Sequence, residues 1–319
     1  MLAKIAIALS LTLSGHASAG LTGPTTLPAA ARADLALPGT GGVKYRETAG
    51  DPVRLSAYGL GTERTYLRST TGGRFTLEQA LSEVSVAPGG RLTAGVPKAY
   101  RSGYDSLIVT DRTTGAAGRI RTVKKPLTAS YASWSRDGKQ VALTVEQKTG
   151  GKWRVIGFTV VDVAAKAART VRVTGLSAKA GFWWSPDGNL VSMYGTGLRV
   201  YRAVDGAVLR TYAGVGLPTG PEDSFSPTGT RLTTWCPSRF KEQLCLVDPA
   251  KGKIVQRVNA RPEALFGWWD DSHVIAVVAR GTAYRLVLLD LTGRTTRVLA
   301  DLPRTTWAAD LWLSFTRGS

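Results

Sequence analysis

The sequence is poor in the residues on which most enzyme active sites depend. Its 319 residues include two cysteines, two methionines and two histidines. One histidine, His16, stands near the N-terminus, so His273 is the single imidazole left for the body of the chain. A Ser-His-Asp triad would therefore have one candidate base, and no Gly-x-Ser-x-Gly elbow accompanies it. We expect no catalytic residues, no metal site and no cofactor.

Long hydrophobic runs are also lacking. After residue 19 no run approaches the ~18 apolar residues that a membrane-spanning helix needs. Residues 1–19 have the features of a secretory signal peptide, with Lys4 as the basic start, an apolar run over residues 5–13 and a small-residue cleavage site at residues 17–19. An ordinary N-terminal helix is the alternative. We expect a secreted, extracellular protein, with cell-wall association left open.

The next segment, residues 20–42, is rich in Gly, Pro, Ala and Thr and has no apolar period. Such a segment cannot bury enough surface to become ordered. The sequence therefore predicts a flexible linker over residues 20–42, followed by one folded domain over residues 43–319.

A motif of aromatic residues followed by a tight turn recurs along this domain. Its clearest copy, residues 182–193, contains Phe-Trp-Trp before the turn and an alternating strand after it. Ser, Pro and Asp favour the first turn positions, and Gly takes the position with positive φ. The turn residues of the three strongest copies are Ser135, Asp137, Gly138; Ser185, Pro186, Asp187, Gly188; and Ser226, Pro227, Gly229.

The spacing of the copies indicates a repeat architecture. With weaker copies included, the first turn residues stand at 87, 135, 185, 226 and 270, so the steps are 48, 50, 41 and 44. A period of roughly 40–50 residues is typical of four-stranded propeller blades. The motif resembles the aromatic-Ser-Pro-Asp-Gly signature of the TolB-like propeller family over residues 84–315, and the WD40 signature is a poorer match. The resemblance implies an all-β protein that takes part in protein or envelope interactions rather than catalysis.

We predict a six-bladed β-propeller in which one blade is shared between the two ends of the domain. Strands near residues 54–58, 65–68 and 74–77 precede the first motif, and the last strand, residues 311–315, has no partner of its own. Pairing them would close the ring and remove its open edge. The alternative is a seventh blade, if the N-terminal strands form a complete sheet.

The formal net charge of +18 indicates either a compositional bias or an anionic partner. In a propeller the motif turns and a second set of Asp turns share one face, which we call the turn face. The remaining loops share the opposite face, which we call the mouth face, and their basic residues outnumber their acidic ones. We predict a binding site for an anionic partner on the mouth face, formed by Lys98, Arg101, Lys124, Lys125, Lys148, Arg239, Lys241 and Arg261. The alternative is that these charged loops are merely solvated.

The two cysteines, Cys236 and Cys245, flank a short loop between two predicted neighbouring strands. An exported chain enters an oxidising environment, so we predict a disulfide between them.

The most consistent interpretation is a secreted, monomeric, non-catalytic binding or scaffold module whose partner is a protein or an anionic cell-envelope polymer. Nucleic acid is not expected, because an exported protein seldom meets it. The alternative is a propeller hydrolase or lactonase with a metal site in the central channel.

Overall fold

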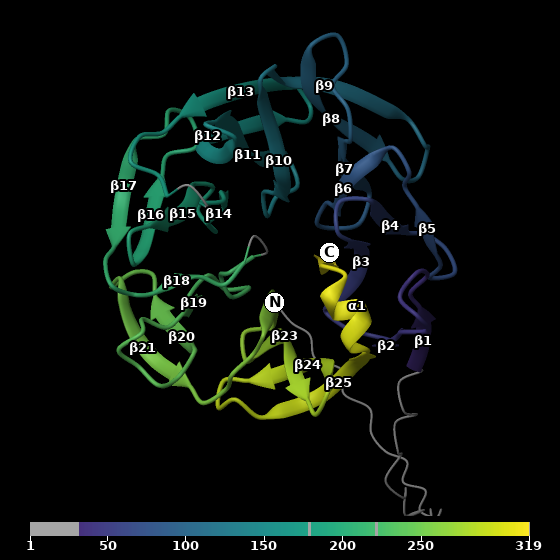
Figure 1. The fold of residues 1–319 in the computed structure, drawn as a ribbon, viewed down its shortest axis with the longest axis vertical. Coiled ribbons are helices and arrows are strands. Elements are labelled where there is room, and N and C mark those ends of the chain that lie inside the picture. The colour runs from purple at the N-terminus through teal and green to yellow at the C-terminus, as the bar shows by residue number, and fades with distance from the viewer. Residues whose placement is uncertain (1–31, 178–179, 221–222, 319) are drawn as a thin grey trace, which may run out of the picture.

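The chain folds into six four-stranded antiparallel sheets arranged in a ring around a central channel (Figure 1). The computed structural model describes residues 32–177, 180–220 and 223–318. Each sheet begins with a strand beside the channel and ends with a strand at the periphery. The predicted six-bladed β-propeller is confirmed. The predicted signal peptide, residues 1–19, lies outside the described residues.

The first three blades each run from an innermost strand at the channel to an outermost strand at the periphery. The first blade contains β26 (Leu311–Arg317), β3 (Val53–Leu60), β4 (Arg64–Arg68) and β5 (Phe75–Leu77). The second contains β6 (Leu81–Val86), β7 (Leu92–Pro97), β8 (Tyr104–Asp111) and β9 (Ala117–Lys124). The third contains β10 (Leu127–Trp134), β11 (Gln140–Thr149), β12 (Lys152–Asp162) and β13 (Ala167–Arg172).

The other three blades follow the same order. The fourth contains β14 (Trp183–Trp184), β15 (Leu190–Tyr194), β16 (Gly197–Tyr201) and β17 (Val208–Tyr212). The fifth contains β18 (Leu217–Pro218), β19 (Leu232–Trp235), β20 (Leu244–Asp248) and β21 (Lys253–Val258). The sixth contains β22 (Ala264–Asp270), β23 (His273–Arg280), β24 (Ala283–Asp290) and β25 (Thr295–Leu302).

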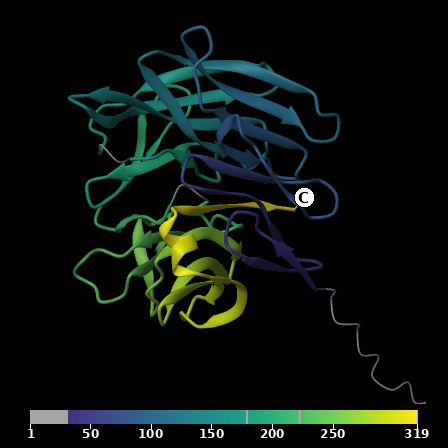
Figure 2. The same ribbon diagram turned by 45° about the vertical axis from the view of Figure 1, so that its right-hand side comes forward.

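The ring is closed by the pairing of the last strand with the first strand of the propeller. Strand β26 runs antiparallel to β3, from Leu311 opposite Leu60 to Arg317 opposite Val53. The predicted shared blade is therefore confirmed, and the N-terminal strands do not form a seventh blade of their own. In Figure 2 the yellow C-terminal strand lies among the purple and blue N-terminal strands of this blade.

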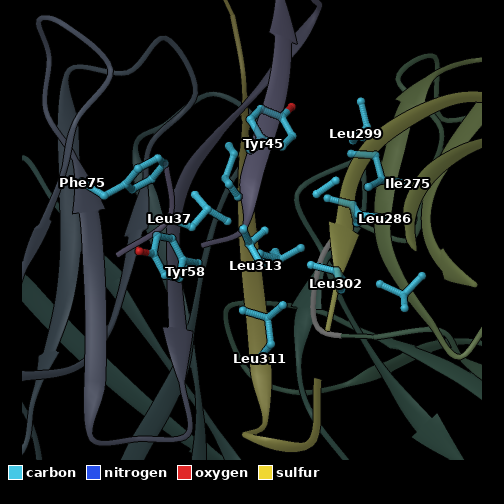
Figure 3. Close-up of a cluster of buried hydrophobic side chains, with 14 of the residues drawn as sticks. Leu37, Tyr45, Tyr58, Phe75, Ile275, Leu286, Leu299, Leu302, Leu311 and Leu313 are labelled. Atoms are coloured by element: carbon cyan, nitrogen blue, oxygen red, sulfur yellow. The ribbon is translucent and has the colours of Figure 1, made fainter. Parts of the chain in front are cut away.

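A two-stranded hairpin precedes the propeller, and it corrects the predicted linker. Strands β1 (Arg32–Ala36) and β2 (Lys44–Thr48) pair with each other. Leu37, Val43 and Tyr45 are buried in the same hydrophobic cluster as Leu313 and Leu299, which belong to the first and sixth blades (Figure 3). Residues 32–42 are thus not a free linker, because Leu37 packs in this cluster beside Val43 and beside Tyr45 of the adjoining strand. Residues 20–31 lie outside the described residues.

The repeated turns have the predicted geometry. Ser135 Oγ donates to Asp137 and also accepts a hydrogen bond from the Gln140 amide at 2.9 Å. Gly138, Gly188 and Gly229 have φ values of 67°, 76° and 73°. The Asp turns lie on the same face, and Asp111, for example, accepts a hydrogen bond from the Thr113 amide. These local bonds fix the register of each blade.

Helical structure is limited. The short helix α1 (Arg304–Ala308) connects β25 to β26. Within the described residues, no helix is long and apolar enough to cross a membrane.

Candidate functional site

The innermost strands enclose a cavity of about 1080 Å³ at the centre of the ring. It is lined by β26, β6, β10 and β22, together with loops of the first, second, third and fifth blades. Apolar side chains do not fill this space. A concave site of this size is the default ligand-binding candidate in a protein without an assigned site.

Aromatic side chains form much of the cavity wall. They are Tyr131, Trp134, Phe266, Trp268, Trp312 and Phe315. Hydrogen bonds hold the indole rings in place: Trp312 Nε1 donates to the Gly61 carbonyl at 3.1 Å, and Trp268 Nε1 donates to the Ser224 carbonyl at 2.9 Å. A Cβ atom at Gly59 would lie 2.3 Å from the Trp312 ring, so glycine is needed for this ring to lie against β3.

Glu83 joins the second blade to an irregularity in the third. Its Oε1 accepts a hydrogen bond from the Ala132 amide at 2.8 Å, where the register between β10 and β11 shifts. Tyr131, the preceding residue, has a φ of 60° and is 52% exposed. Positive φ in a bulky residue is unusual and persists only where the surrounding structure imposes it. Tyr131 in the bulge and Glu83 beside it are both among the residues that line the cavity.

The protonation of Glu83 is set by its surroundings. Desolvation between the blades raises the pKa of Glu83 to about 7, against backbone hydrogen bonds from Ala132 and Tyr131 that lower it. The neighbouring Asp105 adds to the increase. At neutral pH this carboxyl group therefore exchanges between its protonated and charged forms.

Two arginines occupy the turn-face end of the cavity, and both have protein partners. Arg136 reaches from the third blade to the fifth, where it donates to the Pro227 carbonyl at 2.8 Å and to both carboxylate oxygens of Asp223. Arg317 of the first blade donates to the Trp268 and Trp269 carbonyls of the sixth. Burial lowers the pKa of the Arg317 guanidinium. These contacts tie blades together across and around the channel.

The eight predicted anion-binding residues lie in mouth-face loops or at the strand ends beside them, as expected, but they do not gather around the channel. None of them is among the described residues that line the cavity. Lys98 is held near Glu63, with Nζ donating to the Glu63 carbonyl at 2.6 Å. Arg101 is exposed in the second blade. Arg239 and Lys241 belong to the fifth blade, and Arg261 lies at the entry to the sixth.

The other three predicted residues belong to a basic surface on the outer edge of the second and third blades. Leu127 stands opposite Gln147, which brings the segment of Lys124 and Lys125 beside the strand end that carries Lys148. Strand β9 also contacts β13 and β12. We call the whole set the basic edge, and its exposed members are Arg119, Arg121, Lys124, Lys125, Lys148, Lys152, Arg154, Arg169 and Arg172.

The cations of the basic edge are not neutralised within the protein. Among the described residues, none of the nine forms an ion pair with a carboxylate. Two of them lie over aromatic rings, with Arg121 at 5.1 Å from the Tyr104 centroid and Lys125 at 4.9 Å from that of Tyr100. Trp153 stands beside Lys148 on the neighbouring strand and is 47% exposed. This surface combines uncompensated charge with an accessible indole.

The predicted disulfide is present between Cys236 and Cys245, and it closes the loop between β19 and β20. Within that loop the Arg239 guanidinium lies 4.6 Å from the Phe240 ring centroid, and Arg257 of β21 lies 4.9 Å from the same centroid. Arg239 is thus engaged in packing on the outer side of the fifth blade.

Sequence reasoning missed the cavity residues. Arg136 stands where the motif usually has proline, and this substitution was the one visible signal. Glu83 and Tyr131 carried no recognisable signal, because each precedes a motif copy rather than belonging to it. The described residues contain no group of three or more His, Cys, Asp or Glu side chains that could hold a metal ion.

The fold matches solved propellers, although the sequences differ widely. An oligogalacturonate lyase solved in complex with manganese aligns with a TM-score of 0.54 and 11% identity, over 84% of each chain. TolB from Acinetobacter baumannii aligns with a TM-score of 0.50 and 18% identity over 80% of this chain, which spans only 64% of TolB. The acylaminoacyl peptidase of Pyrococcus horikoshii aligns with a TM-score of 0.50 and 11% identity, over 84% of this chain and 46% of the peptidase.

These similarities define the class of protein and nothing narrower. The chain is a six-bladed β-propeller, a fold shared by binding proteins and enzymes. No protein-family model matches it. No curated protein matches its sequence either.

Proposed function

We propose that this protein is an exported, non-catalytic propeller of the TolB-like kind that binds an anionic polymer of the cell envelope through its basic edge. The observation that carries the proposal is the set of nine exposed cations on two adjoining blades, none paired with a described carboxylate. Export is inferred from residues 1–19, and the TolB-like kind from the repeated turn motif.

The energetics require several contacts to act together. An exposed ion pair contributes about 1 kcal/mol or less, so a single lysine would not hold a ligand. A polymer with regularly spaced negative charges can meet many cations at once and gain affinity from their number. The exposed Trp153 adds apolar contact beside the charges. The basic edge therefore fits an extended polyanion better than a small anion.

The mouth-face site predicted from the sequence changes in extent under this proposal. Lys124, Lys125 and Lys148 remain in it, and they are joined by cations of β9, β12 and β13. The contribution of Lys98, Arg101, Arg239, Lys241 and Arg261 stays a prediction. The alternative of a metal-dependent hydrolase or lactonase gains no support from the arrangement of carboxylates in the described residues.

The experiment compares two charge reversals of equal size. Lys124→Glu with Lys125→Glu changes the basic edge, whereas Lys251→Glu with Lys253→Glu changes exposed positions on the turn face. Binding of each double variant to a fluorescent polyphosphate chain is measured by anisotropy at low and high salt. We expect the first pair to weaken binding about tenfold and the second to have a much smaller effect. Binding should also weaken steeply with salt, because the Debye length decreases from about 10 Å at 0.1 M to 3 Å at 1 M.

Equal losses from the two pairs would overturn the proposal, since binding would then follow net charge rather than a particular surface. Anionic lipid vesicles provide a second probe. Stronger binding to vesicles than to polyphosphate, lost on Trp153→Ala, would also contradict it and indicate a membrane surface as the partner.

A further inference from the structure

The lining of the central cavity contains more acidic than basic side chains, in contrast to the protein as a whole. The chain carries a formal charge of +18. The charged side chains that line the cavity are nevertheless mostly acidic: Glu63, Glu83, Asp137, Asp223 and Asp310 against Arg136 and Arg317. Ion pairs hold Glu63 to Lys98, Asp137 to Lys139 and Asp223 to Arg136, and Arg317 donates to two backbone carbonyls. Among the described residues, Glu83 and Asp310 are the lining carboxylates without an ion-pair partner. A ligand entering this space would therefore meet negative charge.

The acids are distributed unevenly along the cavity. Glu63 and Asp310 lie at the mouth-face end of the first blade, and Glu83 lies near the start of β6 on the same side. Both lining arginines lie towards the turn face, at the end of β26 and in the turn after β10. Among the described residues, no cation forms an ion pair with Glu83. The mouth-side half thus contains a carboxylate without a counter-ion.

The aromatic side chains that line the cavity can contact a cation as well as an apolar group. The faces of Trp and Tyr rings attract ammonium and guanidinium groups, by about 0.5–2 kcal/mol depending on desolvation. Tyr131, next to the bulge that binds Glu83, has an exposed ring. The indole of Trp312 is held by its hydrogen bond to the Gly61 carbonyl, so little conformational freedom remains to be lost on binding.

From this arrangement we infer that the cavity binds an organic cation, whose ammonium or guanidinium group meets Glu83 and whose apolar body lies against the aromatic wall. A lysine or arginine side chain presented by a peptide and a free polyamine share this chemistry. The site is separate from the basic edge, which would repel such a ligand.

A purely structural role for Glu83 makes a different prediction. In that case its carboxylate serves only to accept the Ala132 amide, and its charge is irrelevant. Glu83→Gln separates the two roles, because the glutamine carbonyl can still accept this hydrogen bond while the charge is removed. Tyr131→Gly provides a second variant that should fold, since glycine adopts positive φ without strain.

The experiment measures peptide binding by isothermal titration calorimetry. The probes are an acetylated and amidated Ala-Lys-Ala peptide, the same peptide with Nε-acetyllysine, and spermidine. We expect the lysine peptide to bind about tenfold more tightly than its acetylated form, because acetylation removes the charge contact with Glu83 and weakens the cation–π contact. Glu83→Gln and Tyr131→Gly should each weaken its binding several-fold. Glu263→Gln, an equal charge change at an exposed mouth-face residue outside the cavity lining, is the matched control and should bind like the wild type.

The outcomes are distinct. Equal binding of the lysine and acetyllysine peptides, or wild-type affinity in Glu83→Gln, would overturn the inference. Tighter binding of spermidine than of the peptide would support it with a free amine as the source of the cation. Polyphosphate binding should be unaffected in Glu83→Gln, so the failure of this inference and the failure of the proposed function can be told apart.

Discussion

Glu47 binds Arg68 through two parallel hydrogen bonds of 2.6 and 2.8 Å, and the two side chains are only 11% and 14% exposed. This pair connects the N-terminal hairpin to the first blade. On the side of the sixth blade, Arg297 donates to both carboxylate oxygens of Asp51, which follows the hairpin, at 2.7 and 2.9 Å. The same Arg297 side chain donates to the Arg46 carbonyl and the Thr48 hydroxyl of β2, so the hairpin connects the two blades at which the ring is closed.

The Glu47–Arg68 ion pair should contribute measurably to the stability of the protein. Removing one partner of a largely buried ion pair leaves the other charge uncompensated, which typically costs about 3–5 kcal/mol. We expect Glu47→Ala to lower the free energy of unfolding by an amount near this range, as measured by urea denaturation. Arg202→Ala removes an exposed pair with Asp205 and should cost about 1 kcal/mol or less. Similar losses of unfolding free energy in the two variants would show that the Glu47–Arg68 pair does not stabilise the ring.

Closure by β26 leads to a second prediction. Leu313 is 2% exposed and packs between the first and sixth blades, so Leu313→Ala should cost about 2–5 kcal/mol. Leu209 is 45% exposed on β17, and Leu209→Ala should change stability by roughly 0.5 kcal/mol or less. Truncation after Pro303 removes β26 altogether, which exposes the edge of β3 and opens the ring between the first and sixth blades, so cooperative thermal unfolding should be lost. A truncated protein with an unchanged melting curve would contradict the role of the shared blade.

Gly188 offers a test of the turn geometry that involves no other contact. Its φ is 76°, and a Cβ atom at this position would meet no other atom within 4 Å. Gly188→Val should therefore cost about 1–3 kcal/mol from backbone strain alone. Gly118 on β9 has equally open surroundings but no positive φ, so Gly118→Val should have little effect. Equal stability of both variants in thermal melts would mean that strain at Gly188 is negligible.

These turns could be predicted from the sequence, whereas the cavity could not. Turn residues act locally: Ser135, Asp137 and Gly138 form their bonds within a few positions of one another, so the same letters recur wherever the same turn recurs. The chemistry of the cavity arises from residues on different blades, such as Arg136 and Asp223, which are 87 positions apart. No local pattern records that kind of contact.

The hairpin was missed for a related reason. Residues 20–42 have the composition of a linker, yet Leu37 becomes 4% exposed by packing on strands from both ends of the chain. Its burial depends on closure of the ring, which composition does not describe. The basic surface shows a similar pattern. The basic edge depends on contacts between blades, because β9 of the second blade lies beside β12 and β13 of the third, and a sequence pattern within one blade does not record that neighbourhood.

The disulfide should stabilise the fifth blade and the protein as a whole. The two cysteines are nine positions apart, and closing so short a loop contributes roughly 2–3 kcal/mol in the chain-entropy model. We expect the Cys236→Ala and Cys245→Ala double variant to unfold at correspondingly lower urea concentration. A reductant should destabilise the wild type and leave the double variant unchanged. Two free thiols in the unreduced, denatured wild type would rule the bond out.

The raised pKa of Glu83 predicts how stability depends on pH. Its pKa increases from 4.5 to about 7 on folding, mainly through desolvation. The folded state then binds this proton more tightly than the unfolded state, so the favourable contribution is complete below pH ~4.5 and is lost as the pH rises through 7. We expect the melting temperature of the wild type, compared with that of Glu83→Gln, to decrease between about pH 5 and 8. Glu146, whose pKa is also raised by burial, titrates in both proteins and cancels in this comparison. Asp105 does not cancel fully, because its charge contributes to the raised pKa of Glu83, so the measured difference belongs to the Glu83–Asp105 pair. The Asp turns do not interfere, because local hydrogen bonds lower the pKa of Asp111 and Asp248. A constant difference between the two proteins across this range would show that Glu83 keeps its ordinary pKa.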